Sequence, residues 1–236
     1  MIQRIHLAGI CLLLTLVPRV WADLSTALVA YERGDYAAAL TELVPLANGG
    51  NAKAQFKLGW MCALGRGMPQ NDTEALHWYR LAAEQGDASA RSVLGSLYYA
   101  GVSVPQDDKE AVKWYRLAAD QGDPEAQFNL GFMHGTGRGV PQAPTEMVNW
   151  WSRAADQGLA IAQVSLGRLY AKGQDVAQDY VQAHVWLTLA AAQGHKEAAE
   201  ELERIVTSME VPQIVRAKEL AAARGTGLRT PSADRR

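Results

Sequence analysis

Apolar and small residues recur along most of this chain at a fixed interval. Four tryptophans mark it, each 36 residues after the one before: Trp78, Trp114, Trp150 and Trp186. Leucine–glycine pairs and single glycines keep the same step: Leu58-Gly59, Leu94-Gly95, Leu130-Gly131 and Leu166-Gly167, then Gly86, Gly122, Gly158 and Gly194. A fixed period of about 20 to 50 residues is typical of repeat arrays, so an array is predicted in place of a single globular core.

Within one copy, residues 88–123, the apolar spacing predicts a first helix. Its apolar residues share one helical face: Ala90, Leu94, Leu97 and Tyr98. Gly95 would let a neighbouring helix approach closely. Gly101 suits the left-handed residue that commonly ends a helix.

A second helix is predicted after a short loop, because Asp107 and Glu110 form a capping-box pattern. Other copies carry related starts: Asn71 with Glu74, Asp179 with Gln182, and Pro144 with Glu146 where Ala143 replaces the cap. The inner face of this helix combines small and large residues: Ala111, Trp114, Ala118 and Ala119. Alanines against a tryptophan are typical of tight helix contacts, so the tryptophan row is predicted to be buried.

This residue set resembles the Sel-one-like repeat family, the relatives of tetratricopeptide repeats. Four copies are assigned to residues 52–87, 88–123, 124–159 and 160–195. The resemblance implies an all-α fold, a right-handed α/α superhelical solenoid of helix pairs. A few positions depart from the pattern: Cys62 and His134 at the tyrosine place, Ser103 and Asp175 at a loop glycine, and Met147 at an alanine.

The two ends of the chain differ from the copies. Arg4, an apolar run over residues 7–17 and small residues at Val20 and Ala22 predict a signal peptide, residues 1–22. An uncleaved interfacial anchor is the alternative. The run is shorter than the roughly 20 residues of a spanning helix. The other assignments are a tetratricopeptide-like helix pair (23–51), C-terminal capping helices (196–224) and a disordered tail (225–236).

Composition and motifs favour neither catalysis nor a cofactor nor a metal. The formal net charge of −2 gives no reason to expect nucleic acid. Residues 135–139 read GTGRG but lack the lysine and hydroxyl of a phosphate loop. The histidines are scattered, and serine-nucleophile motifs are missing. Cys62, alone once the signal is removed, is interpreted as a small buried apolar residue.

The first helices of a repeat array line its concave surface. The resemblance implies that the lining positions lie five and two residues before the Leu-Gly leucine, and two, five and six after it. Five aromatics that differ between copies fall there, with one basic neighbour: Phe56, Trp60, Tyr99, Phe128, Phe132 and Arg168. These six are the candidate partner-binding residues, since a residue that the fold required should repeat. The alternative is that the aromatics fill gaps between helices.

The chain is therefore interpreted as an exported, non-enzymatic scaffold that binds a protein or peptide in its groove, in the periplasm after signal cleavage. The resemblance implies this role. Two alternatives remain: a weak cell-wall-active hydrolase, and a secreted factor that acts on a host cell. A hydrolase needs convergent polar residues, which the sequence lacks. A secreted factor would be found in the culture medium.

Overall fold

The computed structural model describes residues 23–225, in which twelve α-helices follow one another without a strand. The predicted signal peptide and residues 226–236 of the predicted tail lie outside the described residues. In chain order the helices are α1 (Leu24–Glu32), α2 (Tyr36–Asn48), α3 (Ala52–Leu64), α4 (Asp72–Glu84), α5 (Ala88–Ala100), α6 (Asp108–Ala119), α7 (Pro124–Thr136), α8 (Pro144–Asp156), α9 (Ala160–Lys172), α10 (Tyr180–Ala192), α11 (Lys196–Val206) and α12 (Val211–Gly225).

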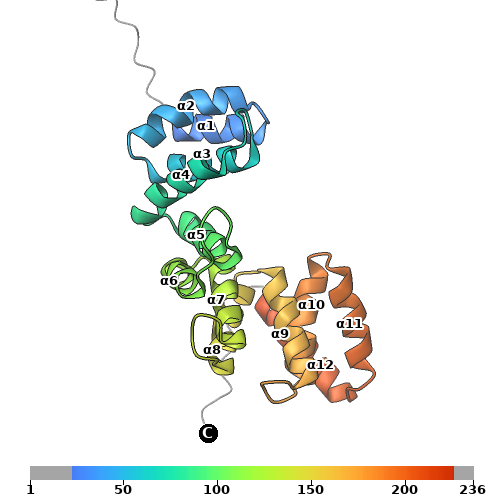
Figure 1. Ribbon diagram of the computed structural model, residues 1–236. Helices are drawn as coiled ribbons and strands as arrows, with labels where there is room; N and C mark the ends of the chain where they lie inside the picture. Colours follow the sequence, from blue (N-terminus) through green and yellow to red (C-terminus); the bar gives the residue numbers. More distant parts are fainter. Residues whose placement is uncertain (1–22, 226–236) are drawn as a thin grey trace, which may run out of the picture.

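The helices pack in chain order. Within each copy the first helix packs on the second: α3 on α4, α5 on α6, α7 on α8 and α9 on α10. Each second helix also packs on the first helix of the next copy. Figure 1 shows the resulting elongated array, which winds from α1–α4 through α5–α8 to α9–α12. The repeat array predicted from the 36-residue period and the all-α solenoid implied by the family resemblance are confirmed.

Helix starts follow the predicted capping chemistry. The side chains of Asn71, Asp107 and Asp179 accept backbone N–H bonds at the starts of α4, α6 and α10. Ala143 offers no such bond, and Pro144 begins α8. First helices are capped in the same way by residues that the sequence reasoning did not single out: Asn51, Asp87 and Asp123.

The loops between paired helices hold residues in the left-handed region. Gly101 ends α5 there with a φ of 69°, as predicted. Two positions further on, Ser103 and Asp175 adopt φ values of 60° and 65°, where the other copies have glycine. A non-glycine residue in this conformation costs roughly 1–2 kcal/mol. Ser103 and Asp175 therefore keep the backbone conformation that glycine has in the other copies, and this conformation strains them locally.

Paired helices approach each other closely at the Leu-Gly glycine. A Cβ built on Gly95 would lie 2.5 Å from Cδ1 of Tyr115, which follows the tryptophan of α6. The equivalent glycine of repeat 3 meets Trp151, with an ideal Cβ also 2.5 Å from its Cδ1. The close approach predicted for Gly95 is thus confirmed, and its partner is the residue after each tryptophan.

One departure from the repeat pattern is compensated across the helix pair. Met147 stands where other copies have alanine, and its Sδ occupies the space that a Cβ on Gly135 would need, 2.5 Å away. The missing side chain of Gly135 in α7 therefore accommodates the larger residue of α8. This explains why repeat 3 keeps its packing despite the methionine.

The prediction that the whole tryptophan row is buried is wrong for two of its four members. Trp150 and Trp186 are buried, whereas Trp78 and Trp114 are only partly buried. Trp186 is enclosed because α12 packs on α10 and the Arg224 guanidinium lies 4.3 Å from the ring centre. Trp78 and Trp114 pack at the margin of a core cluster, so burial depends on what covers each second helix.

A polar joint holds each copy to the one before it, and the sequence reasoning missed it. Buried glutamines of the first helices donate to the carbonyls of Ala47, Ala119 and Ala155, near the ends of the preceding second helices: Gln55, Gln127 and Gln163. The side-chain oxygens of these buried glutamines accept hydrogen bonds from three further glutamines, which follow the second helices of the same copies: Gln85, Gln157 and Gln193. In repeat 2 Arg91 replaces the glutamine and bonds the Ala83 carbonyl. Each of these carbonyls also accepts a backbone bond from the glycine that follows the helix, so the joint gives it a second donor.

The two ends of the array are built differently from its middle. Residues 33–35 connect α1 and α2, a shorter link than residues 65–71 in repeat 1, as expected for a tetratricopeptide-like pair. At the other end both α11 and α12 pack on α10. Ala217 and Ala221 of α12 are buried against Val185. These helices cover the last copy, as the name capping helices implies.

Candidate functional site

Four hollows lie in order along the first helices of the array. The first, about 440 Å³, is bounded by α3, α5 and the start of α7, and the second, about 220 Å³, by α5, α6 and α7. The third, about 330 Å³, lies between α7 and α9, and the fourth, about 400 Å³, between α9 and α11. Each of the six residues selected from the sequence lines at least one of them: Phe56, Trp60, Tyr99, Phe128, Phe132 and Arg168.

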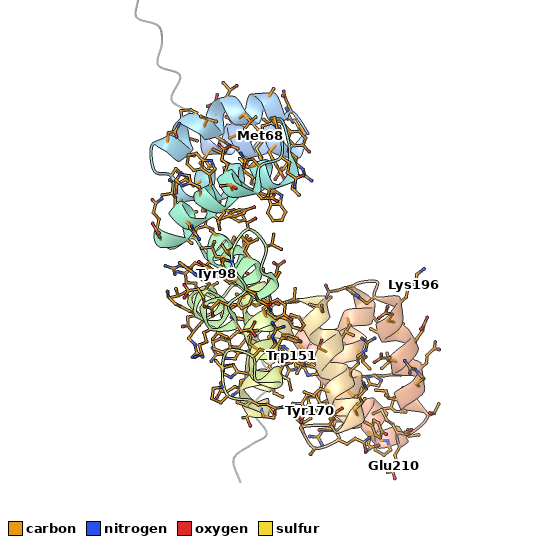
Figure 2. All side chains as sticks on the ribbon, in the orientation of Figure 1. Met68, Tyr98, Trp151, Tyr170, Lys196 and Glu210 are labelled. Carbon is orange, nitrogen blue, oxygen red and sulfur yellow. The ribbon has the colours of Figure 1, made fainter. Side chains whose placement is uncertain are left out.

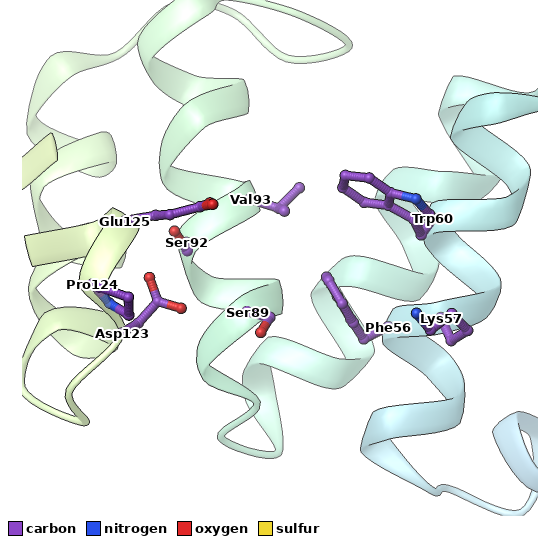
Figure 3. A pocket seen from close by; sticks show the side chains of 9 residues that line it. All are labelled: Phe56, Lys57, Trp60, Ser89, Ser92, Val93, Asp123, Pro124 and Glu125. Atoms are coloured by element: carbon purple, nitrogen blue, oxygen red, sulfur yellow. The ribbon is translucent and has the colours of Figure 1, made fainter. Parts of the chain in front are cut away.

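The α3–α5 hollow has an aromatic wall on α3. Phe56 lies between two other rings, with its centroid 6.3 Å from that of Trp60 and 5.9 Å from that of Tyr79. Phe56 is partly buried, whereas 39% of Trp60 is exposed. Figure 3 shows both rings on one side of the hollow and the start of α7 on the other. Trp60 therefore presents a large apolar surface to solvent on the lining row.

The α5–α7 hollow brings together the three middle candidates. The Tyr99 and Phe132 rings meet edge to face with centroids 6.0 Å apart. Phe128 lines the same hollow beside them. Arg138, from the loop of repeat 3, lies 4.2 Å from the Tyr99 ring centre and is held by a two-bond ion pair to Asp108. Arg138 was not selected from the sequence, because the lining positions were sought only on the first helices and Arg138 lies in a loop.

Arg168 is engaged by α11. Its guanidinium donates to Glu201, 2.6 Å away, and to Glu197, 3.1 Å away. The hydrogen bonds to these carboxylates raise the pKa of Arg168. The side chain still lines the third and fourth hollows, but much of its charge is neutralised by α11.

The variation of the aromatics between copies is partly explained by contacts across each helix pair. Phe128 stacks on Trp151 at 5.5 Å between centroids, and the indole N–H of Trp151 donates to the Phe128 carbonyl. Figure 2 labels Trp151 among the side chains of the array. Phe56 contacts Tyr79, which holds the same place in α4. Phe56 and Phe128 therefore belong partly to the core, whereas Trp60 and Phe132 depend less on this pairing. The aromatic residues that follow the repeat tryptophans, Tyr79 and Trp151, could have indicated this pairing in the sequence.

Two reactive side chains, Cys62 of α3 and His134 of α7, are buried in separate repeats. Cys62 is fully buried, as predicted, and burial raises the pKa of its thiol to about 11. Burial and the nearby Arg116 lower the pKa of His134. Among residues 23–225, histidine, cysteine and acidic side chains form no group of three suited to a metal ion. No helix in that part of the chain is long and apolar enough to cross a membrane.

The repeat assignment agrees with comparisons with known proteins. A family model described as Sel1 repeat matches residues 52–87, 88–123, 124–159 and 160–195, the same four copies predicted from the period. No curated protein matches the chain. The Sel-one-like resemblance noted in the sequence is to this family.

Solved structures share the fold. A protective antigen present in uropathogenic Escherichia coli strains, described as displaying an SLR fold, is 38% identical with a TM-score of 0.69. The match covers 79% of this chain and 41% of the antigen, so the chain spans about two fifths of that protein. A Sel1 repeat protein from Oxalobacter formigenes is 28% identical, with a TM-score of 0.73 and coverage of 86% and 85%.

More distant structures show the fold alone. An immunity protein from Pseudomonas aeruginosa is 20% identical, with a TM-score of 0.54 and coverage of 87% of this chain and 81% of that one.

Sel1 repeat proteins are generally scaffolds for protein–protein interaction. With four matched copies that occupy more than half of its length, this chain belongs to the Sel1 repeat family.

Proposed function

We propose that the chain is a non-enzymatic scaffold that binds a protein or peptide partner along the row of hollows on its first helices. The observation that carries this proposal is Trp60, a large aromatic residue on a lining row that remains 39% exposed. Exposed aromatic residues are enriched among the anchors of protein interfaces. Phe132 supports the proposal, because it lines both the α5–α7 and the α7–α9 hollow.

The remaining chemistry of the site also supports binding over catalysis. The first three hollows are lined mainly by aromatic, aliphatic and small side chains, with charged residues distributed among them. The fourth is lined mainly by charged side chains, of which Arg168 is paired with Glu201. A hydrolase would need a nucleophile, a base and an oxyanion-stabilising group that converge on one point. Cys62, the one cysteine among residues 23–225, is fully buried, and burial raises the pKa of its thiol to about 11.

Replacing Trp60 or Phe132 with alanine should each weaken partner binding by about 1–3 kcal/mol, because anchor residues lose contact area in the complex. The melting temperature should fall less than for a buried tryptophan. Binding is measured as the amount of each envelope protein captured by the purified chain, and unfolding is measured on the same variants.

Leu117→Ala is the matched control, because Leu117 of α6 is 37% exposed and lines none of the four hollows. We expect a set of proteins that the wild type and Leu117→Ala both capture and that both groove variants lose. An unchanged set of captured proteins, or a loss of folding in the groove variants, would assign the aromatics to the core.

We further propose that the scaffold acts in the periplasm. The support is the sequence of residues 1–22, which has the order of a basic, an apolar and a small-residue segment found in secretory signals. The mature protein should begin at Asp23. The intact mass of the protein recovered from the cell envelope tests this expectation, and a mass that retains residues 1–22 would contradict export by cleavage.

A further inference from the structure

Two small side chains form part of the floor of the α3–α5 hollow. Ser89 and Ser92 of α5 lie where the neighbouring copies place larger residues on the same rows. Ser92 is buried, and Figure 3 shows the two serines between the rings of α3 and the start of α7. The hollow of about 440 Å³ is therefore a trough between two raised walls, with room for one long side chain.

The two walls differ in chemistry. On α3 the wall consists of the Phe56 and Trp60 rings, which present π faces and edges. On α7 it consists of Asp123 and Glu125. Asp123 uses one carboxylate oxygen to cap Ala126, 2.7 Å away, whereas Glu125 is exposed and makes no hydrogen bond or ion pair within residues 23–225. One wall thus offers aromatic surface and the other negative charge.

The single lysine at the margin of the hollow is directed elsewhere. The ammonium of Lys57 lies 4.4 Å from the ring centre of Tyr31, a residue of α1. A cation over an aromatic ring is held there by the ring's quadrupole. The two carboxylates are therefore not paired with Lys57, and the hollow keeps a net negative charge.

We propose that this hollow binds an arginine side chain of the partner, which is a peptide segment. This inference rests on the proposed function of the groove. An arginine would lay its apolar stem and guanidinium plane against Trp60 and Phe56 and donate hydrogen bonds to Glu125. Arginine fits better than lysine, since its planar group stacks on aromatic rings and pairs with carboxylates through two parallel bonds.

The neighbouring hollow defines the rest of the recognised segment. The α5–α7 hollow is lined by Tyr99, Phe128 and Phe132 and suits an apolar side chain. Both hollows are lined by α5, where Ser92 and Tyr99 are seven positions apart, or about 10 Å along the helix at 1.5 Å per residue. An extended chain advances about 3.3 Å per residue. An apolar residue about three positions from the arginine would therefore reach this second hollow. The recognised peptide carries both residues at this spacing.

A peptide library tests the inference without knowledge of the natural partner. The probes are N-acetylated, C-amidated peptides with one fixed phenylalanine and every other position varied, incubated with the folded chain that begins at Asp23. Arginine should be enriched about three positions from the phenylalanine. In the best peptide, citrulline, which has nearly the shape of arginine but no charge, should weaken binding about threefold to tenfold.

Three variants divide the possible outcomes. Glu125→Gln should bring the arginine and citrulline peptides to similar affinities, whereas Glu84→Gln, an exposed acid that lines none of the hollows, should leave their ratio unchanged. Phe132→Ala should weaken both peptides about equally. Circular dichroism confirms that each variant is folded.

Two results would overturn the inference. Peptides that lose affinity with Phe132→Ala but show no arginine preference, or a preference that Glu125→Gln does not change, would remove the arginine site and leave the binding groove in place. If no library peptide binds in a way that depends on Phe132 or Trp60, both the arginine site and the proposed groove function fail.

Discussion

Replacing Trp186 with alanine is expected to lower the free energy of unfolding by about 3–5 kcal/mol, the range for a large aromatic residue removed from a close-packed site. Only 2% of this side chain is exposed, and it shares a core cluster with Ala154, Ala155 and Leu166. The substitution also removes the surface on which Arg224 of α12 rests. Both the last copy and its cap should therefore be loosened.

Chemical denaturation measures the loss, and hydrogen exchange locates it. In a repeat array each copy contacts only its neighbours, so protection should fall mainly in α8–α12 and little in α1–α4. Trp114→Ala serves as the comparison, because Trp114 is partly buried and its indole N–H has no hydrogen-bond partner. Its loss should be smaller. A loss below 1 kcal/mol for Trp186→Ala would contradict its place in the core.

Replacing Gly95 with valine is expected to cost about 3 kcal/mol, at the upper end of the range for overpacking. Two effects oppose each other here. Valine has a higher helix propensity than glycine, but the difference is well below 1 kcal/mol. Against it stands the ring of Tyr115, whose Cδ1, Cε1 and Cγ would lie 2.5, 2.7 and 2.9 Å from the new Cβ. The steric effect is larger, so the net change is destabilising.

The ring of Tyr115 has little freedom to move away. It is 3% exposed, and its hydroxyl donates to Ser96 Oγ, 3.1 Å away. Adding Tyr115→Ala to Gly95→Val should therefore recover part of the loss, which appears as a favourable coupling in a double-mutant cycle. Ala100→Val, at the exposed end of α5, controls for the β-branched side chain. Additive effects of the two substitutions at positions 95 and 115 would show that the contact is not strained.

Much of the fold could be predicted from the sequence, because every copy repeats the same local signals. The 36-residue step gave the four copies, and the caps at Asn71, Asp107 and Asp179 placed the second helices. Burial of individual tryptophans could not be predicted from the period. It depends on the neighbouring elements: α12 packs on α10 and encloses Trp186, whereas Trp150 is buried in a cluster with residues of α6 and α7.

The candidate site was located from the sequence, but its internal contacts were not. The lining positions, counted from the Leu-Gly leucine, placed all six residues along the hollows, since they depend only on helix phase. They gave no information about the pairing of Phe128 with Trp151 or of Arg168 with Glu201, which are contacts between elements. The acidic wall at Asp123 and Glu125 was also missed. Glu125 lies on a lining row, five residues before Leu130, but only the aromatics and Arg168 were selected from these rows, and Asp123 lies outside them.

The glutamine joints have a consequence for how such chains evolve. The acceptor carbonyls of Ala47, Ala83, Ala119 and Ala155 are themselves 36 residues apart, and each receives a side chain from the next copy. A tandem duplication or an in-frame deletion of one 36-residue unit therefore joins a donor to an acceptor of the same kind. Recombination can lengthen or shorten the array in whole units, and with it the number of first helices that line the groove.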